Sequence, residues 1–265
     1  MLDTATQRSC PNFEGTNCTP WAQYSPDDWE LVKCIDCDMT YLRNPVTYEA
    51  LKEDFAWEKT YVEKTEKGGS TRLSSFARKL RTSTIGLTRD NHSKCRKWFN
   101  DGAVLDIGCG SGHRVKDPMT PYGIELSNEL HAQADAMMRN KGGYCAHGAG
   151  AAAIWEFEPS HFDWVLMFSY LEHETDVLSV LRGTHRALKD TGAFFIRVPN
   201  FGSLNRHVIS PKWCGFRYPD HVNYFTLSTL RNVAKRTGFD TTLIKRATSM
   251  VDDNIHVLLR KFARS

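Results

Sequence analysis

The segment from Val104 to Gly112, which reads VLDIGCGSG, contains the residues best suited to chemistry in this chain. An apolar stretch leads into Asp106, and Gly108, Gly110 and Gly112 follow at alternate positions. Glycine lets the backbone turn sharply and approach a ligand without a Cβ in the way. The segment therefore predicts a strand that ends in a loop built to hold a nucleoside cofactor.

A second acidic residue follows the glycines at an interval that suits a bound nucleoside. Tyr122 to Leu126 reads as a short strand ending in Glu125, and 125 minus 106 is 19. A carboxylate about 20 residues on, at the tip of the neighbouring strand, can accept hydrogen bonds from both ribose hydroxyls, with Leu126 against the adenine. The alternative is that Glu125 only favours the start of a helix expected over Ser127 to Asn140. Because the third glycine comes one residue earlier than in G-x-G-x-x-G, the pattern favours S-adenosylmethionine over NAD.

Beyond this motif, the chain resembles the class I S-adenosylmethionine-dependent methyltransferases from about Asp101 to the C-terminus. Phe162 to His173 resembles the fourth strand of that fold with its loop, and Leu188 to Asn200 resembles a helix end, a turn and the fifth strand. Pro219 to Phe239 is similar to the segment that follows in the small-molecule branch of the family. The resemblance implies S-adenosylmethionine as cofactor and methyl transfer to oxygen or carbon of a small metabolite, sugar or glycan precursor.

Hydrophobic periodicity agrees with an α/β fold. One helix is expected from Val177 to Leu188, before Gly192, and another from Leu230 to Thr237, also before a glycine. Thr241 to Met250 and Asn254 to Phe262 read as strands that are joined by too few residues for a crossover helix. We therefore expect a Rossmann-like, seven-stranded methyltransferase sheet that a C-terminal antiparallel hairpin closes.

The resemblance assigns cofactor contacts to the glycine loop and to the strand ends. The implied set is Asp106, Gly108, Cys109, Gly110, Gly112, Glu125, Leu126 and Phe168. Only eleven residues, His113 to Gly123, separate the loop from the next strand, and Pro118 and Pro121 leave room for barely one helical turn. The cofactor carboxylate is then expected to receive less help from a helix dipole, which weakens affinity. The stretch from His147 to Ala149 stands where relatives place an acidic residue for the adenine amino group.

Two histidines are candidates for the base that methyl transfer to a hydroxyl or an acidic carbon requires. His173 follows the fourth strand, and His221 lies in the aromatic-rich segment from Trp213 to Phe225, which either walls an acceptor pocket or packs a long loop. The alternatives are that His173 caps a helix or pairs with Glu172, and that His221 is a structural turn histidine. Similar ubiquinone-pathway O-methyltransferases bind a divalent ion here with two glutamates and a histidine. Ser169 replaces the first glutamate, so no catalytic metal is expected.

Eight cysteines divide unevenly, and four of them lie within the first 37 residues: Cys10, Cys18, Cys34 and Cys37. Without an export signal, they are better interpreted as thiols or metal ligands than as disulfides. Cys34 and Cys37 form a C-x-x-C knuckle that suits a tetrahedral ion, whereas seven residues separate Cys10 from Cys18. Relatives in this branch carry an N-terminal zinc ribbon, which implies one structural zinc. A degenerate ribbon, with thiols packed as small apolar groups, is the alternative.

The length of 265 residues accommodates one large domain and a smaller accessory region. We expect a zinc-ribbon-like segment over residues 1–47 and a helical lid or linker over residues 48–100. Residues 101–265 then form the S-adenosylmethionine-binding domain.

Charge and hydropathy limit the function classes. A net charge of +3 is too small to indicate nucleic acid or a membrane surface as partner, and no apolar run is long enough to cross a bilayer. Residues 1–20 are polar where a signal peptide would be hydrophobic, so a cytoplasmic protein is expected. The alternatives to a small-molecule enzyme are an RNA or protein methyltransferase and a non-catalytic cofactor-binding scaffold.

Overall fold

The structure is a computed structural model that describes residues 7–46, 101–244 and 250–263. The chain divides into two compact units, one joining Met1–Thr47 to Gly102–Ser265 and the other made of Tyr48–Asp101. The predicted helical lid over residues 48–100 lies outside the described residues. The division into three parts at residues 47 and 100 stays a prediction.

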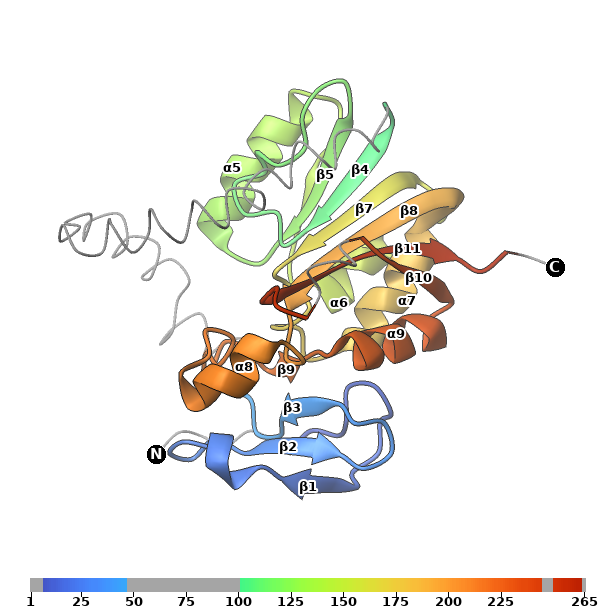
Figure 1. Cartoon of the computed structure of the whole chain (residues 1–265). Coiled ribbons are helices and arrows are strands. Elements are labelled where there is room, and N and C mark those ends of the chain that lie inside the picture. Colours follow the sequence, from blue (N-terminus) through green and yellow to red (C-terminus); the bar gives the residue numbers. More distant parts are fainter. Residues whose placement is uncertain (1–6, 47–100, 245–249, 264–265) are drawn as a thin grey trace. The chain divides into compact units, whose positions relative to one another are not determined.

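A mixed seven-stranded sheet with the order β10-β11-β8-β7-β4-β5-β6 forms the centre of the first unit (Figure 1). Its strands are β4 (Ala103–Ile107), β5 (Thr120–Glu125), β6 (Cys145–His147), β7 (Phe162–Phe168), β8 (Leu188–Pro199), β10 (Phe239–Leu243) and β11 (Asn254–Lys261). The five strands from β4 to β8 pair in parallel, while β11 pairs antiparallel with both β8 and β10. The predicted Rossmann-like sheet with its C-terminal hairpin is therefore confirmed.

The strand order reverses between β4 and β7. From β4 the chain adds β5 and β6 on one side, and it then returns to add β7 and β8 on the other. In open α/β sheets, ligands bind beyond the carboxyl ends of the strands at such a reversal. The ends of β4 and β7 therefore mark where a site is expected.

The described helices are α5 (Asn128–Arg139), α6 (Gly150–Ala153), α7 (Val177–Ala187), α8 (Leu204–Ile209) and α9 (Leu227–Arg236). Three short 3-10 turns accompany them: η1 (Ala22–Tyr24), η2 (Ile154–Glu156) and η3 (Ser210–Lys212). Side chains cap the longer helices, because Ser127 accepts a hydrogen bond at the start of α5 and Asp176 does so at the start of α7. The start of α9 carries a capping box between Thr226 and Thr229.

Some predicted boundaries differ from the structure. Helix α7 ends at Ala187, one residue before the predicted Leu188, because Leu188 already pairs with Phe162 as the first residue of β8. Strand β10 begins at Phe239, two residues before the predicted start, since Phe239 already pairs with Lys261. The predicted end of this strand falls on residues 245–249, which lie outside the described residues.

Apolar strands account for the core. Parallel strands that are covered on both faces have sequences that are almost continuously hydrophobic. The central strands β4, β7 and β8 follow this rule and bury Leu105, Ile107, Val165, Met167, Phe194 and Ile196. The rigid sheet that results fixes the positions of the strand ends and of the loops that follow them.

A second, four-stranded antiparallel sheet has the order β1-β2-β3-β9. Its strands are β1 (Cys18–Pro20), β2 (Leu31–Cys34), β3 (Thr40–Leu42) and β9 (Asn223–Tyr224). The last strand comes from a segment far along the chain, and Tyr41 pairs with Asn223. The N-terminal segment is therefore bonded to the segment that carries His221.

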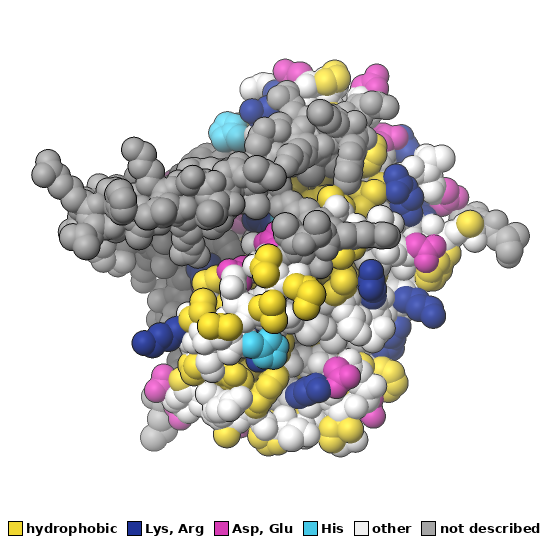
Figure 2. Space-filling model, in the orientation of Figure 1, with side chains coloured by type: hydrophobic (Ala, Val, Ile, Leu, Met, Phe, Trp, Pro, Cys, Tyr) yellow, Lys and Arg dark blue, Asp and Glu magenta, His cyan; other side chains and the backbone are white. Residues whose placement is uncertain are grey.

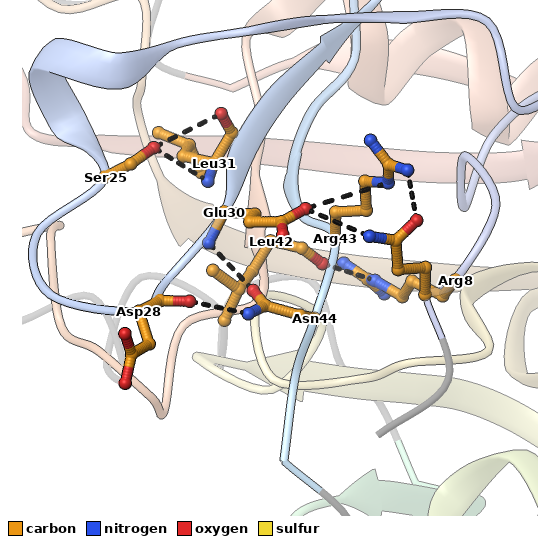
Figure 3. A network of polar contacts seen from close by, with 9 residues as sticks. Arg8, Ser25, Asp28, Glu30, Leu31, Leu42, Arg43 and Asn44 are labelled. Carbon is orange, nitrogen blue, oxygen red and sulfur yellow. Dashed lines mark hydrogen bonds and ion pairs between the residues drawn. The ribbon is translucent and has the colours of Figure 1, made fainter. Parts of the chain in front are cut away.

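Side chains around Asn44 hold the N-terminal sheet together (Figure 3). Asn44 accepts a hydrogen bond of 2.8 Å from the Glu30 N–H and donates one of 2.7 Å to the Asp28 carbonyl. Arg8 donates to the Leu42 carbonyl at 2.8 Å and also to the carbonyls of Thr175 and Val222. Arg8 thus joins the N-terminal segment to both loops that carry the candidate histidines.

Apolar side chains are exposed around α8, where Figure 2 shows a cluster of hydrophobic atoms. The exposed residues are Leu204, Val208, Ile209, Met250 and Val251. In the described part of the chain, no helix is both long enough and apolar enough to cross a membrane.

Candidate cofactor and acceptor sites

The glycine loop begins where β4 ends and folds back onto β5. The N–H groups of Gly108 and Cys109 both donate to the carbonyl of Ile124. Gly108 has a φ of +71°, and a Cβ on it would lie 2.7 Å from the ring of Tyr170. Gly110 has a φ of +57°, and among the described residues, apart from its two chain neighbours, no atom lies within 4 Å of the place its Cβ would take. Gly108 thus permits close packing, whereas Gly110 faces open space that suits a ligand.

Glu125 ends β5 beside this loop, and its carboxylate is surrounded by backbone donors. Oε2 accepts a hydrogen bond of 2.8 Å from the Gly110 N–H, and Oε1 accepts from the N–H groups of Leu126 and Ser127. The last two bonds lie just before α5, as the helix-start interpretation requires. The first bond places the acid against the glycine loop, as the ribose interpretation requires. Both interpretations therefore keep support.

The other predicted cofactor residues lie around the same strand ends. Leu126 is half-buried, and its carbonyl oxygen lies 3.1 Å from Nε2 of His147. Phe168 is buried as the last residue of β7. The segment after the glycine loop is predicted to have room for barely one helical turn, and the described residues 108–119 contain no helix.

Asp106 is fully buried near the end of β4, and Arg114 neutralises it. The Nη1 group of Arg114 donates to both carboxylate oxygens of Asp106, at 2.7 Å to Oδ2. Burial raises the pKa of Asp106 to about 6, although Arg114 opposes this shift. The Arg114 guanidinium also lies 5.2 Å from the centre of the Phe168 ring. Sequence reasoning missed Arg114, and the available signal was a cation in a loop too short for a helix.

Cys109 is a packing residue in this structure. Its Sγ atom lies 3.6 Å from that of Cys145, in a buried cluster with Ala134 and Met138. The contact with Cys145 and burial raise the pKa of the Cys109 thiol. A thiol that stays protonated is a poor nucleophile.

The two candidate histidines lie together, although 48 positions separate them in the sequence (221 minus 173). Their ring centres are 4.7 Å apart in a T-shaped arrangement. The Nδ1 atom of His173 lies 2.7 Å from the Asp220 carbonyl, and that of His221 lies 2.8 Å from the Gly215 carbonyl. Because a carbonyl only accepts, each Nδ1 carries the proton, and Nε2 is the basic nitrogen of each ring.

Glu172 completes this cluster. Potential ligand atoms of Glu172, His173 and His221 all lie within 4.8 Å of one another. Burial raises the pKa of Glu172 to about 8 and lowers the pKa of His173 to about 3 and that of His221 to about 4. All three groups are therefore neutral near pH 7. These three side chains offer three ligand atoms to a divalent cation, although the sequence predicts no catalytic metal here.

The aromatic segment packs against the N-terminal sheet. Trp213 and Tyr224 are buried in one cluster with Tyr24, Leu31 and Phe201. For these two residues, the loop-packing interpretation is favoured over an acceptor pocket. A surface hollow lies elsewhere, by β11 and α9, and its lining includes none of the predicted site residues.

Three of the four N-terminal cysteines converge. Ligand atoms of Cys10, Cys34 and Cys37 lie within 4.8 Å of one another, and Cys10 Sγ is 3.5 Å from Cys37 Sγ. Cys18 is outside this group but pairs with Cys34 across β1 and β2, so both side chains lie on one face of the sheet. Burial raises the pKa of the Cys10 thiol to about 12, and a bound cation would lower it.

The sheet order and the glycine loop define a class of α/β proteins that bind a nucleoside cofactor at the strand ends. Comparison with known proteins identifies the family. The sequence pattern of a methyltransferase domain matches residues 77–244, which is more than half of the chain. The chain therefore belongs to this family of methyltransferase domains.

Among curated proteins, the chain is similar to an uncharacterized protein of Methanocaldococcus jannaschii, at 32% identity over 40% of each chain. It is also similar to a tRNA U34 carboxymethyltransferase of Sulfurimonas denitrificans, at 26% identity over 54% of this chain and 51% of the relative. The chain thus matches about half or less of the length of these relatives. A solved S-adenosylmethionine-dependent methyltransferase of Archaeoglobus fulgidus shares the fold, with a TM-score of 0.53 and 13% identity over 76% of this chain and 99% of that one.

Proposed function

We propose that this protein transfers a methyl group from S-adenosylmethionine to oxygen or carbon of a small metabolite, sugar or glycan precursor. The observation that carries the proposal is the joining of the glycine loop to Glu125 at one edge of the sheet. When bound, the cofactor supplies an electrophilic methyl group on a sulfonium. The protein must hold it, position the acceptor and accept a proton.

For the cofactor, we propose that Glu125 accepts hydrogen bonds from the ribose hydroxyls and that Leu126 lies against the adenine. The open space beside Gly110 and the absence of a Cβ there support this assignment. Gly108, Cys109 and Gly112 shape the loop, and the ends of β4 and β7 contribute Asp106 and Phe168.

For the acceptor, we propose that His173 or His221 takes the proton through Nε2. The backbone carbonyls of Asp220 and Gly215 hold the two rings in the tautomer that this role needs. Because both rings are neutral near pH 7, the base is ready without a prior deprotonation. The low pKa values make each a weak base, so most of the rate must come from positioning and exclusion of water.

A small acceptor is supported by the setting of this cluster. Glu172 and His221 are almost fully buried, and the loop before His221 is packed against the N-terminal sheet. A buried cluster admits a small molecule more readily than part of a folded macromolecule. An RNA acceptor is the second candidate, because one relative is a tRNA carboxymethyltransferase.

Binding and transfer experiments distinguish a small-molecule methyltransferase from an RNA methyltransferase and from a non-catalytic scaffold. Calorimetry with S-adenosylhomocysteine first establishes cofactor binding, which a scaffold and an enzyme share. Transfer of labelled methyl groups is then measured with the small-molecule fraction and the RNA fraction of a cell extract. Label only in nuclease-sensitive material would favour the RNA alternative, and cofactor binding without transfer to any fraction would favour the scaffold.

We also propose that Cys10, Cys18, Cys34 and Cys37 hold one structural zinc ion. The convergence of three thiols and the pairing of Cys18 with Cys34 support four tetrahedral ligands. Such a site is closed, so the ion would stabilise the sheet that is bonded to the His221 segment. Its role would be structural or acceptor-gating. A cytoplasmic location remains part of this proposal.

A further inference from the structure

The amino-acid end of S-adenosylmethionine carries a carboxylate that needs a positive partner. A helix N-terminus is the usual source of positive potential beside a glycine loop. In this protein the described residues 108–119 form turns and no helix. The protein must therefore neutralise that carboxylate with another group.

This loop carries two cations, Arg114 and the exposed Lys116, and it is Arg114 that contacts Asp106. Only part of the hydrogen-bonding capacity of Arg114 is used. A guanidinium offers five N–H donors on three nitrogens. Nη1 alone contacts Asp106, and no described residue accepts a hydrogen bond from Nε or Nη2 of Arg114. The Arg114 side chain is 23% exposed, whereas that of Asp106 is fully buried. The Arg114 side chain is thus more exposed than the acid that it contacts, and two of its nitrogens have no acceptor among the described residues.

The guanidinium also lies where the strand order reverses. It bridges Asp106 near the end of β4 and Phe168 at the end of β7, with 5.2 Å to the ring centre. Those two strands flank the crevice in which ligands of open α/β sheets bind. A flat cation that is bonded to an acid and lies over an aromatic ring is held in one orientation.

We infer that Arg114 binds the α-carboxylate of the cofactor and replaces the missing helix N-terminus, with Asp106 as the residue that positions it. This inference rests on the proposed cofactor site. Arg197 is the competing cation, because it lies 5.3 Å from the same Phe168 ring. Arg197 already donates to the Ser169 hydroxyl at 2.8 Å, and burial lowers its pKa. Those constraints favour Arg114.

The experiment compares three ligands by calorimetry: S-adenosylhomocysteine, its decarboxylated amine and 5′-methylthioadenosine. The first carries the carboxylate, the second lacks only that group, and the third lacks the whole amino acid. Arg114→Gln should weaken S-adenosylhomocysteine about ten- to hundredfold, as expected for lost hydrogen bonds to a charged group. The affinities of the two ligands without a carboxylate should change by less than about threefold.

Controls separate recognition from folding. Because Arg114→Gln leaves a buried carboxylate unpaired, the double variant Asp106→Asn with Arg114→Gln removes both charges and should show the same selective loss. Arg139→Gln is the matched surface control, since the described partner of Arg139 is Asp135 on α5. Melting curves of all variants report whether each one folds.

Three results would overturn the inference. Equal weakening of all three ligands would mean that Arg114 only supports the loop. If Arg197→Gln weakened only the binding of S-adenosylhomocysteine, and Arg114→Gln left that binding unchanged, the carboxylate would be assigned to Arg197. If wild-type protein bound none of the three nucleosides, the cofactor proposal itself would fail and the inference with it.

Discussion

Glu125 and Gly110 are bonded across the mouth of the glycine loop, with 2.8 Å between the carboxylate Oε2 and the backbone nitrogen. This bond is possible because β4 and β5 are neighbouring parallel strands. Ile107 pairs with Ile124, and the glycine loop and Glu125 follow directly after these two residues. The bond fixes the loop and places an acceptor-rich group beside the open face of Gly110.

The first prediction concerns this acid. Glu125→Ala should weaken binding of S-adenosylhomocysteine by on the order of 1–3 kcal/mol, the scale of leaving ribose hydroxyls without partners. Calorimetry measures the change, and Glu129→Ala serves as control because it removes an exposed acid from the first turn of α5. A folded Glu125 variant with wild-type affinity would exclude the ribose role and leave only the helix-start interpretation.

The second prediction concerns zinc. Elemental analysis of protein purified without chelator should find about one zinc per chain. Cys34→Ser and Cys37→Ser should lose it and melt at lower temperature, while Cys214→Ser, at an exposed cysteine, should retain it. Cys18→Ser decides whether the fourth thiol is a ligand.

Metal-free protein that still melts cooperatively would contradict the zinc proposal. A metal equivalent that survives in the Cys37 variant but disappears in His221→Gln would instead locate an ion at Glu172, His173 and His221.

The third prediction concerns the base. Replacing a true general base typically lowers the rate about 10²–10⁴-fold and leaves cofactor affinity nearly intact. His173→Gln and His221→Gln should be compared in single-turnover experiments once an acceptor is known. Since burial lowers the pKa values to about 3 and 4, the wild-type rate should be flat near neutral pH. Wild-type rates in both variants would make the two histidines structural.

The fourth prediction concerns stability in acid. The pKa of His221 is about 4 in the folded protein and about 6.5 when unfolded, so the unfolded state binds more protons between these values. The contribution of the neutral ring is therefore present above pH 6.5 and is lost as the pH falls toward 4. Denaturant unfolding across this range should show a shallower pH dependence for His221→Gln than for wild type. His207→Gln, at an exposed histidine, should behave as wild type.

Several features were readable from the sequence because neighbours in the chain determine them. The strand and turn around Gly110 follow from apolar residues and glycines in direct succession, and Ser127 marks the start of α5 as a local cap. The C-terminal hairpin follows from a connection too short for a crossover helix. In these cases, spacing along the chain sets the geometry.

Other boundaries depend on pairing between distant strands. Helix α7 ends at Ala187 because Leu188 pairs with Phe162 in the sheet. The local hydrophobic periodicity does not identify that partner. In the same way, β9 joins the N-terminal sheet because Asn223 meets Tyr41.

The site shows the same division between local and long-range information. The sequence by itself determined the glycine loop, the acid at its fixed interval and the family of the fold, since each depends on residue type and spacing. Only the tertiary structure brought His173 to His221 and laid Arg114 over Asp106 and against Phe168. Those contacts depend on which strands are neighbours and on burial, and burial also sets the protonation of the histidines. Sheet order and desolvation are properties of the whole fold, so no stretch of sequence holds them alone.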